Sequence, residues 1–331
     1  MPLHDAHYQH WEGIHTGIWR RRWAIAQNGL AACLRGKFLR YVMLLSWVGG
    51  LAMAALLFFL GQLLVPDSIM SKWVAQMNPN LRAFAAMLTS WLQDHPEVSV
   101  GTTQNVLFYF YGVYSMPLSI VALAMALPVL ITRDLGSNAI VIYSSKAVTR
   151  GDYLFGKFCT AFGLMTLTWL GPVCAAWFLG NLLAPDWMFF WHARMALIHL
   201  LFFGLCSMAV LSLLALGVSA LSSREKSTPF IWLAWWVLGI AIQPIALHTK
   251  PWLRHVSFGF NIRQIGLAVF RLGKELQTAQ DSIPIFGQML RDVSKTTRYA
   301  LDHPLVGSAL VGLGLMLLAA WAIVNKRVVP E

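Results

Sequence analysis

Residues 151–158 read Gly-Asp-Tyr-Leu-Phe-Gly-Lys-Phe, which has the Gly-x-x-x-x-Gly-Lys spacing of a nucleotide-binding phosphate loop. In such a loop, backbone N–H groups hold the phosphates, and a Ser or Thr after the lysine binds magnesium. Phe158 stands where that hydroxyl is needed, and no buried strand precedes the pattern. We therefore expect no nucleotide site, no ATPase activity and no cofactor in this chain.

Histidine is the other residue type that offers chemistry. His4, His7 and His10 are three residues apart and could share a helix face as metal ligands, but no Cys or carboxylate supports them. His192 and His199 are seven apart, on one face of an apolar run. A neutral imidazole at His199 takes part in proton or substrate transfer, or simply bonds a neighbouring helix.

The composition indicates that these residues belong to a membrane protein. Of 331 residues, 57% are hydrophobic and 12% are charged, which is outside the balance of soluble domains. Six runs reach the ~20 apolar residues that cross a bilayer core, and none contains Asp, Glu, Lys or Arg. They are residues 41–65, 106–131, 158–183, 196–221, 229–247 and 305–324. We predict an all-α integral membrane protein with six transmembrane helices, formed by residues 41–331.

The net charge of +11 does not indicate nucleic acid, because the cations mostly flank the spans. With the N-terminus in the cytoplasm, the inner segments hold most of the Lys and Arg, as the positive-inside rule requires. The outer segment 248–304 is the exception. No cleavable signal is recognised before the first span. We predict a multi-pass protein of the cell inner membrane with both termini cytoplasmic.

Helices are also expected outside the spans. Residues 14–40 carry apolar side chains at three- and four-residue intervals, so residues 1–40 are expected to form a cytoplasmic tail and an amphipathic helix in the inner interface. A small outer helix is predicted between Pro79 and Pro96. Residues 248–304 are expected to form outer-leaflet helices, one at 262–270 and a polar one at 288–301.

Prolines interrupt two of the predicted spans. Pro117 and Pro128 lie in the second apolar run, and Pro172 lies in the third. Because proline has no N–H and clashes with the preceding turn, these positions predict kinks or unwound turns.

A polar island, residues 132–157, separates the second and third runs. Lipid cannot cover it, so it must face water or a protein partner. The spans offer no buried carboxylate for an ion-coupled carrier, so energy for transport would come from a partner, with the island as its contact. We expect Asp134 and Arg150 to lie on its exposed surface, and their substitution to leave the fold intact.

At this island the chain resembles the permease subunit of type-2 ATP-binding-cassette exporters. That family has an amphipathic lead helix, six spans, and a first inner loop that enters the ATPase as a coupling helix. Its loop runs from an acidic residue through a Gly turn and small residues to an Arg and a closing Gly-Lys. The matching residues are Asp134, Gly136, Ser144, Ser145, Val148, Thr149, Arg150, Asp152, Tyr153, Gly156 and Lys157. Ala147 stands where the family usually has Pro, and the connection before the last span is longer than the family's.

The resemblance implies a half-transporter. Two partner ATPase subunits would bind ATP and magnesium, and a second permease copy or paralogue would complete the pathway by alternating access. The residues implied in contact with the ATPase are Arg133, Asp134, Gly136, Ser144, Ser145, Arg150, Asp152 and Lys157.

Two other classes remain open from the sequence. The chain could be a membrane scaffold that binds a partner or lipid through segment 248–304. An intramembrane enzyme is the third class, but no H-E-x-x-H or G-x-S-x-G motif and no pair of intramembrane aspartates supplies a catalytic group.

Overall fold

The computed structural model describes residues 17–65, 68, 72–73, 76, 78–139, 149–184, 186–282 and 300–328. These residues form helices joined by short turns, and no strand occurs among them. Six helices within this part of the chain are long and apolar enough to cross a membrane. The predicted all-α fold with six spans is therefore confirmed.

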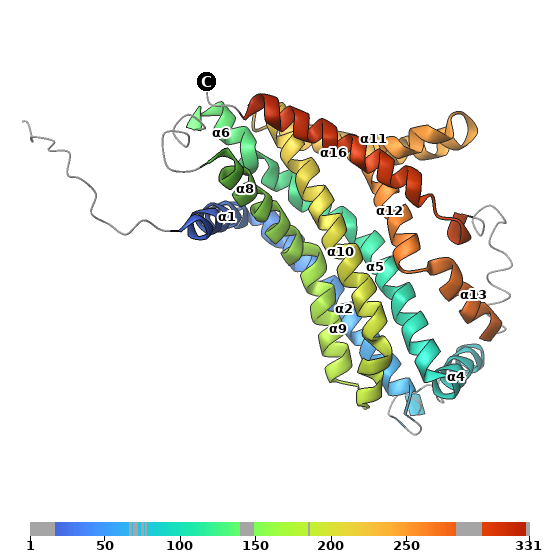
Figure 1. The fold of residues 1–331 in the computed structure, drawn as a ribbon. Helices are drawn as coiled ribbons and strands as arrows, with labels where there is room; N and C mark the ends of the chain where they lie inside the picture. Colours follow the sequence, from blue (N-terminus) through green and yellow to red (C-terminus); the bar gives the residue numbers. More distant parts are fainter. Residues whose placement is uncertain are drawn as a thin grey trace, which may run out of the picture.

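The spans form an elongated bundle (Figure 1). Those that run along its length are α2 (Lys37–Leu63), α5 (Pro96–Leu127), α8 (Arg150–Met165) with its continuation α9 (Gly171–Leu182), and α10 (Trp187–Leu221). α11 (Ser227–His248) and α16 (Val306–Arg327) cross the bundle obliquely. We call the end with α6 (Arg133–Gly136) and the C-terminus the α6 end, and the end with α4 (Pro79–Asp94) the α4 end.

The helices extend further than the apolar runs. The second span begins at Pro96 rather than at residue 106, and the third begins at Arg150 rather than at residue 158. A helix that has already nucleated adds a hydrogen bond for each further residue, so it continues into polar sequence beyond the hydrocarbon core. Apolar length alone therefore places the span starts too late.

The expected lead helix is present as α1 (Ile18–Leu34). Its buried residues, Ala26, Gly29 and Cys33, pack against α8, where a side chain on Gly29 would collide with Thr160. Trp19 and Trp23 are instead 70% and 68% exposed. The apolar residues of α1 are thus divided between a protein contact and a surface where indole rings suit a membrane interface.

The predicted outer helix between Pro79 and Pro96 is α4. After α11 come η3 (Pro251–Val256), α12 (Phe258–Val269) and α13 (Leu272–Ser282). α12 is part of the core, because Phe258 and Ile262 are each 1% exposed. The ring of Phe258 stacks on that of Trp232, with the two ring centroids 5.1 Å apart. The polar helix expected at 288–301 lies mostly outside the described residues.

Two spans contain wider, π-helical turns next to prolines. η1 (Pro128–Thr132) interrupts the second span, and η2 (Thr166–Leu170) ends two residues before Pro172 in the third. The irregular turns predicted at Pro128 and Pro172 are confirmed, whereas at Pro117 the α-helix α5 continues without one. π-turns free backbone groups and recur at functional sites, so their surroundings are candidate functional sites.

α11 and α16 bury less of their surface than the other spans. In α16 the buried residues are Ala309, Leu313, Ala320 and Val324. Its backbone approaches α10 closely at Gly217, where a Cβ would lie 2.5 Å from the Ala320 methyl. Small residues allow this approach, as is usual between membrane helices.

The arrangement predicts which positions face which side of the membrane. In a variant without the native cysteines, Ser137→Cys at the α6 end is expected to react with an impermeant maleimide only from the cytoplasm. Asp94→Cys at the α4 end is expected to react only from the opposite side, because both residues are exposed and the apolar runs of the spans between them contain no Asp, Glu, Lys or Arg. Labelling of both from one side would contradict this topology.

Candidate functional site

The π-turn η1 is held by a hydroxyl from α10. Ser219 Oγ donates to the carbonyl oxygen of Leu127 at 2.7 Å and accepts from the backbone N–H groups of Ile131 and Thr132 at 2.8 and 3.1 Å. Thr132 Oγ1 donates back to the Ser219 carbonyl oxygen at 2.8 Å. Both side chains are fully buried. The end of the second span is therefore fixed to α10.

A buried ion pair joins the same turn to α8. Lys157 Nζ lies 2.8 Å from Asp134 Oδ2 and donates to the carbonyl oxygen of Val129, also at 2.8 Å. The Tyr153 hydroxyl donates to Asp134 Oδ2 at 2.7 Å. Asp134 and Lys157 are 9% and 8% exposed. The pair neutralises two charges that are largely removed from water, and Lys157 also satisfies a carbonyl of η1.

The start of α8 is linked to α1 by a second buried carboxylate. Thr149 caps the helix, with its Oγ1 accepting from Asp152 N at 3.2 Å and its own N–H donating to Asp152 Oδ2. Asp152 Oδ1 accepts from Arg22 Nε on α1. This capping box satisfies N–H groups that a helix start leaves free, and the ion pair fixes α1 to it.

An exposed ion pair connects α6 to the turn before α11. Arg133 donates from Nε and Nη2 to the two carboxylate oxygens of Glu225, both at 3.1 Å. These hydrogen bonds hold the pKa of the Glu225 carboxyl below its usual value. Gly136 lies against the same turn, where a Cβ would be 2.9 Å from the Ser223 carbonyl oxygen. The missing side chain of Gly136 thus allows α6 to pack against the turn that holds Ser223 and Glu225.

Arg150 points to the last span. Its Nη2 donates to the carbonyl oxygen of Val324 on α16 at 3.0 Å, and the residue is half-buried. The expectation that Asp134 and Arg150 are exposed is wrong, because Asp134 is buried against Lys157 and Tyr153, and Arg150 is half-buried against α16. Ser144 and Ser145 lie outside the described residues. Of the predicted contact residues that the structure describes, Arg133 and Gly136 are exposed, whereas Asp134, Asp152 and Lys157 are buried.

A second polar site lies toward the α4 end, in a cavity of about 700 Å³ between α5, α10 and α13. The Glu275 carboxylate of α13 accepts hydrogen bonds from Thr102 Oγ1 and from Asn105 Nδ2, the latter at 2.8 Å. His199 Nδ1 lies 3.0 Å from Asn105 Oδ1. His192, as predicted, lies on the same side of α10 and also lines this cavity.

The hydrogen bonds define the state of His199. The Asn105 amide presents its NH₂ group to Glu275 and its oxygen to His199. Because an amide oxygen only accepts, His199 Nδ1 carries the hydrogen of this bond. His199 thus bonds a neighbouring helix, and a part in proton transfer stays a prediction.

Sequence reasoning missed Glu275 because it considered carboxylates only within the spans. The carboxylate comes from α13, a helix between the last two spans, and reaches His199 through Asn105. Asn105 directly precedes the second apolar run, so hydropathy alone places it at the start of that run and outside the bundle core. A search for polar residues on helices that could re-enter the bundle would have included both.

The described residues contain no cluster of three His, Cys, Asp or Glu side chains arranged for a metal ion. His4, His7 and His10 lie outside them. No protein-family model and no curated protein matches the chain. The six long apolar helices among the described residues make the chain a multi-pass helical membrane protein with six candidate spans.

The buried ion pair predicts a large effect on stability. Lys157→Met leaves Asp134 without a counter-ion and is expected to lower the free energy of unfolding by about 3 to 5 kcal/mol. Asp134→Asn combined with Lys157→Met should recover part of that loss, because no lone charge remains buried. Thermal unfolding of the purified protein in detergent measures both.

Arg133→Gln is the matched control. It breaks an ion pair whose side chains are 53% and 49% exposed, so its expected cost is below about 1 kcal/mol. Equal melting temperatures for Lys157→Met and Arg133→Gln would show that the buried pair does not stabilise the turn.

Proposed function

We propose that this chain is the membrane-spanning subunit of an ATP-driven exporter of the type-2 ATP-binding-cassette class. In this proposal the α6 end faces the cytoplasm of the cell inner membrane, and separate ATPase subunits bind there. A second copy of the chain, or a paralogue, completes the transporter. The chain itself hydrolyses no ATP.

The supporting observation is that η1 and α6, which form a turn at the end of the second span, are bonded to several other helices. Side chains connect this turn to α8 through Lys157, to α10 through Ser219, and to the turn before α11 through Glu225. α8 is connected in turn to α1 and to α16. A force applied to α6 would therefore move several helices as one body, which is what a coupling element between an ATPase and a membrane domain must do.

The scaffold alternative has less support. It needs segment 248–304 as a binding surface, but much of the described part of that segment packs within the chain. Phe258, Phe270 and Leu272 are at most 1% exposed. Trp252 and Val256, both in η3, are instead 61% and 44% exposed. The helices α12 and α13 therefore contribute to the bundle, and in the described part of the segment only η3 offers apolar side chains to a partner or to lipid.

Charge reversal at the exposed pair tests the proposal. Arg133→Glu and Glu225→Arg each place like charges together, and each is expected to reduce the ATP hydrolysis that the membrane subunit stimulates in the purified complex. The double variant restores an ion pair, so it should recover the stimulation if the pair transmits movement. Arg224→Glu is the control, since the described residues make no ion pair with it.

The outcomes separate two roles for Arg133. A double variant as defective as Arg133→Glu would mean that Arg133 contacts the ATPase directly. Wild-type ATP hydrolysis and normal recovery of the complex in both single variants would remove the α6 end from the mechanism.

The cavity around Glu275 favours a second candidate function, a carrier driven by protons. Glu275, Asn105 and His199 provide a proton-binding group near the membrane, which the spans alone do not. ATP-driven export predicts that the chain alone, reconstituted into vesicles with a pH-sensitive dye, conducts no protons after a pH jump. A proton flux that Glu275→Gln abolishes, and that Glu97→Gln in the same cavity preserves, would favour the carrier.

A further inference from the structure

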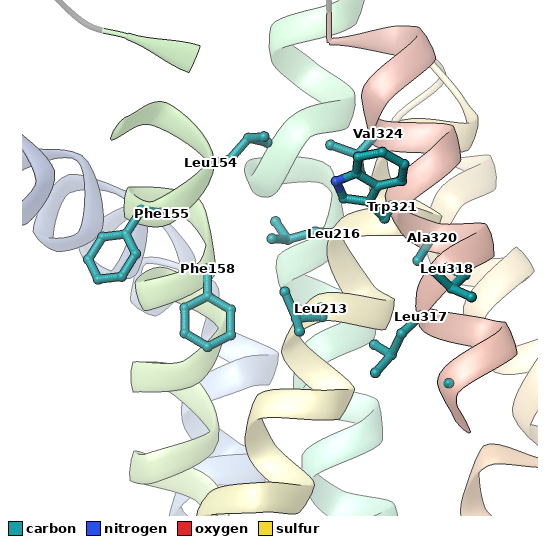
Figure 2. A pocket seen from close by; sticks show the side chains of 11 residues that line it. Leu154, Phe155, Phe158, Leu213, Leu216, Leu317, Leu318, Ala320, Trp321 and Val324 are labelled. Atoms are coloured by element: carbon teal, nitrogen blue, oxygen red, sulfur yellow. The ribbon is translucent and has the colours of Figure 1, made fainter. Parts of the chain in front are cut away.

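An apolar groove of about 780 Å³ opens on the side of the bundle near the α6 end. α8 and α16 form its two walls, and α10 lies between them at its floor (Figure 2). Both walls pack against α10 but are held apart from each other. The lining residues are Leu154, Phe155, Phe158, Leu213, Leu317 and Trp321, among others.

The apolar lining alone does not select an occupant. Lipid tails are as apolar as leucine, so burying this surface against a tail gains little over leaving it in the bilayer. A preference of the groove for one lipid over another must come from its shape and from groups at its mouth that recognise the lipid headgroup.

The mouth of the groove carries positive charge. Arg150 begins α8 one turn before Leu154 and donates to the carbonyl oxygen of Val324, so it bridges the two walls. Its Nε is buried and has no hydrogen-bond partner among the described residues. Arg327 ends α16 three residues beyond Val324 and is exposed.

No acidic side chain compensates Arg150 in the described part of the chain. The nearest carboxylate along α8, Asp152, is bonded to Arg22 and Thr149 instead. The start of α8 adds the positive end of a helix dipole at the same place. An anion at the mouth would lie beside two cations and a helix start, and would supply the negative charge that no carboxylate among the described residues provides there.

We propose that this groove binds one acyl chain of an anionic phospholipid from the adjacent leaflet, with the phosphate at Arg150. Basic pockets between membrane helices are known to hold acidic headgroups in this way. The site is independent of whether the chain transports anything. The lipid would fill the space between α8 and α16 and so fix the distance between the third and the last span.

The test is native mass spectrometry of protein released from vesicles of equal phosphatidylglycerol and phosphatidylcholine. The wild-type protein is expected to retain one phosphatidylglycerol in preference to phosphatidylcholine. Arg150→Gln should reduce this preference about fivefold, the effect of one cation at a membrane surface. Arg150→Lys, which keeps the charge, should retain most of it.

A second variant tests the groove without changing a charge. Gly314 lines the groove, and a Cβ there would meet open space, so Gly314→Trp is expected to place its indole in the groove. It is expected to lose the retained lipid of either headgroup. Gly307→Trp is the control on the same helix, because its Cβ also meets open space but Gly307 is not among the lining residues.

Lys326→Gln is the matched charge control. Lys326 is two residues from Val324, which places it on the opposite face of α16, so its loss should leave the headgroup preference unchanged. Equal retention of the two lipids by the wild type, or lipid retained by Gly314→Trp, would overturn the proposal. A dimer that Gly314→Trp dissociates without release of lipid would also overturn it, and would assign the groove to a second copy of the chain.

Discussion

Inside a bilayer no water is available to bond a backbone group that a helix leaves free, and this constraint governs how the bundle is held together. Pro128 and Pro172 each accompany a π-turn within a span. At the first, Ser219 and Lys157 bond the freed groups. At the second, the Trp47 indole donates to the carbonyl oxygen of Leu167 at 3.1 Å. At each irregular turn a side chain from a neighbouring helix therefore bonds backbone groups of the turn, and these bonds hold the helices together.

The two polar sites are connected by the same pair of helices. α5 carries Asn105 toward the α4 end and leads into η1 at the α6 end, while α10 carries His199 and Ser219 in the same order. These two spans pack closely along their length. A change in the angle between them would alter both the cavity around Glu275 and the contacts of η1 with the Asp134–Lys157 ion pair. The bundle thus provides a physical route between its two ends.

The number of spans and the helical class followed from the sequence because a long uncharged run has few alternatives in water or lipid. The irregular turns followed for a similar reason, since proline excludes a regular hydrogen bond. The burial of Asp134 did not follow, because it depends on Lys157, which is 23 residues away and on another helix. Glu275 was equally hidden, because its partners Thr102 and Asn105 lie on α5 and local sequence carries no sign of that approach.

α16 closes the groove and supplies the carbonyl that Arg150 bonds, and it follows the five other candidate spans in the order of synthesis. The helices from α2 to α10 can associate while the remainder of the chain is still on the ribosome, because membrane helices insert first and pack afterwards. During that interval the Arg150 guanidinium has no carbonyl from α16, and the face of α10 around Gly217 is open to lipid. Arrival of α16 therefore supplies the carbonyl that Arg150 bonds and covers the face of α10 around Gly217, so the surroundings of the third span are complete only once α16 has packed.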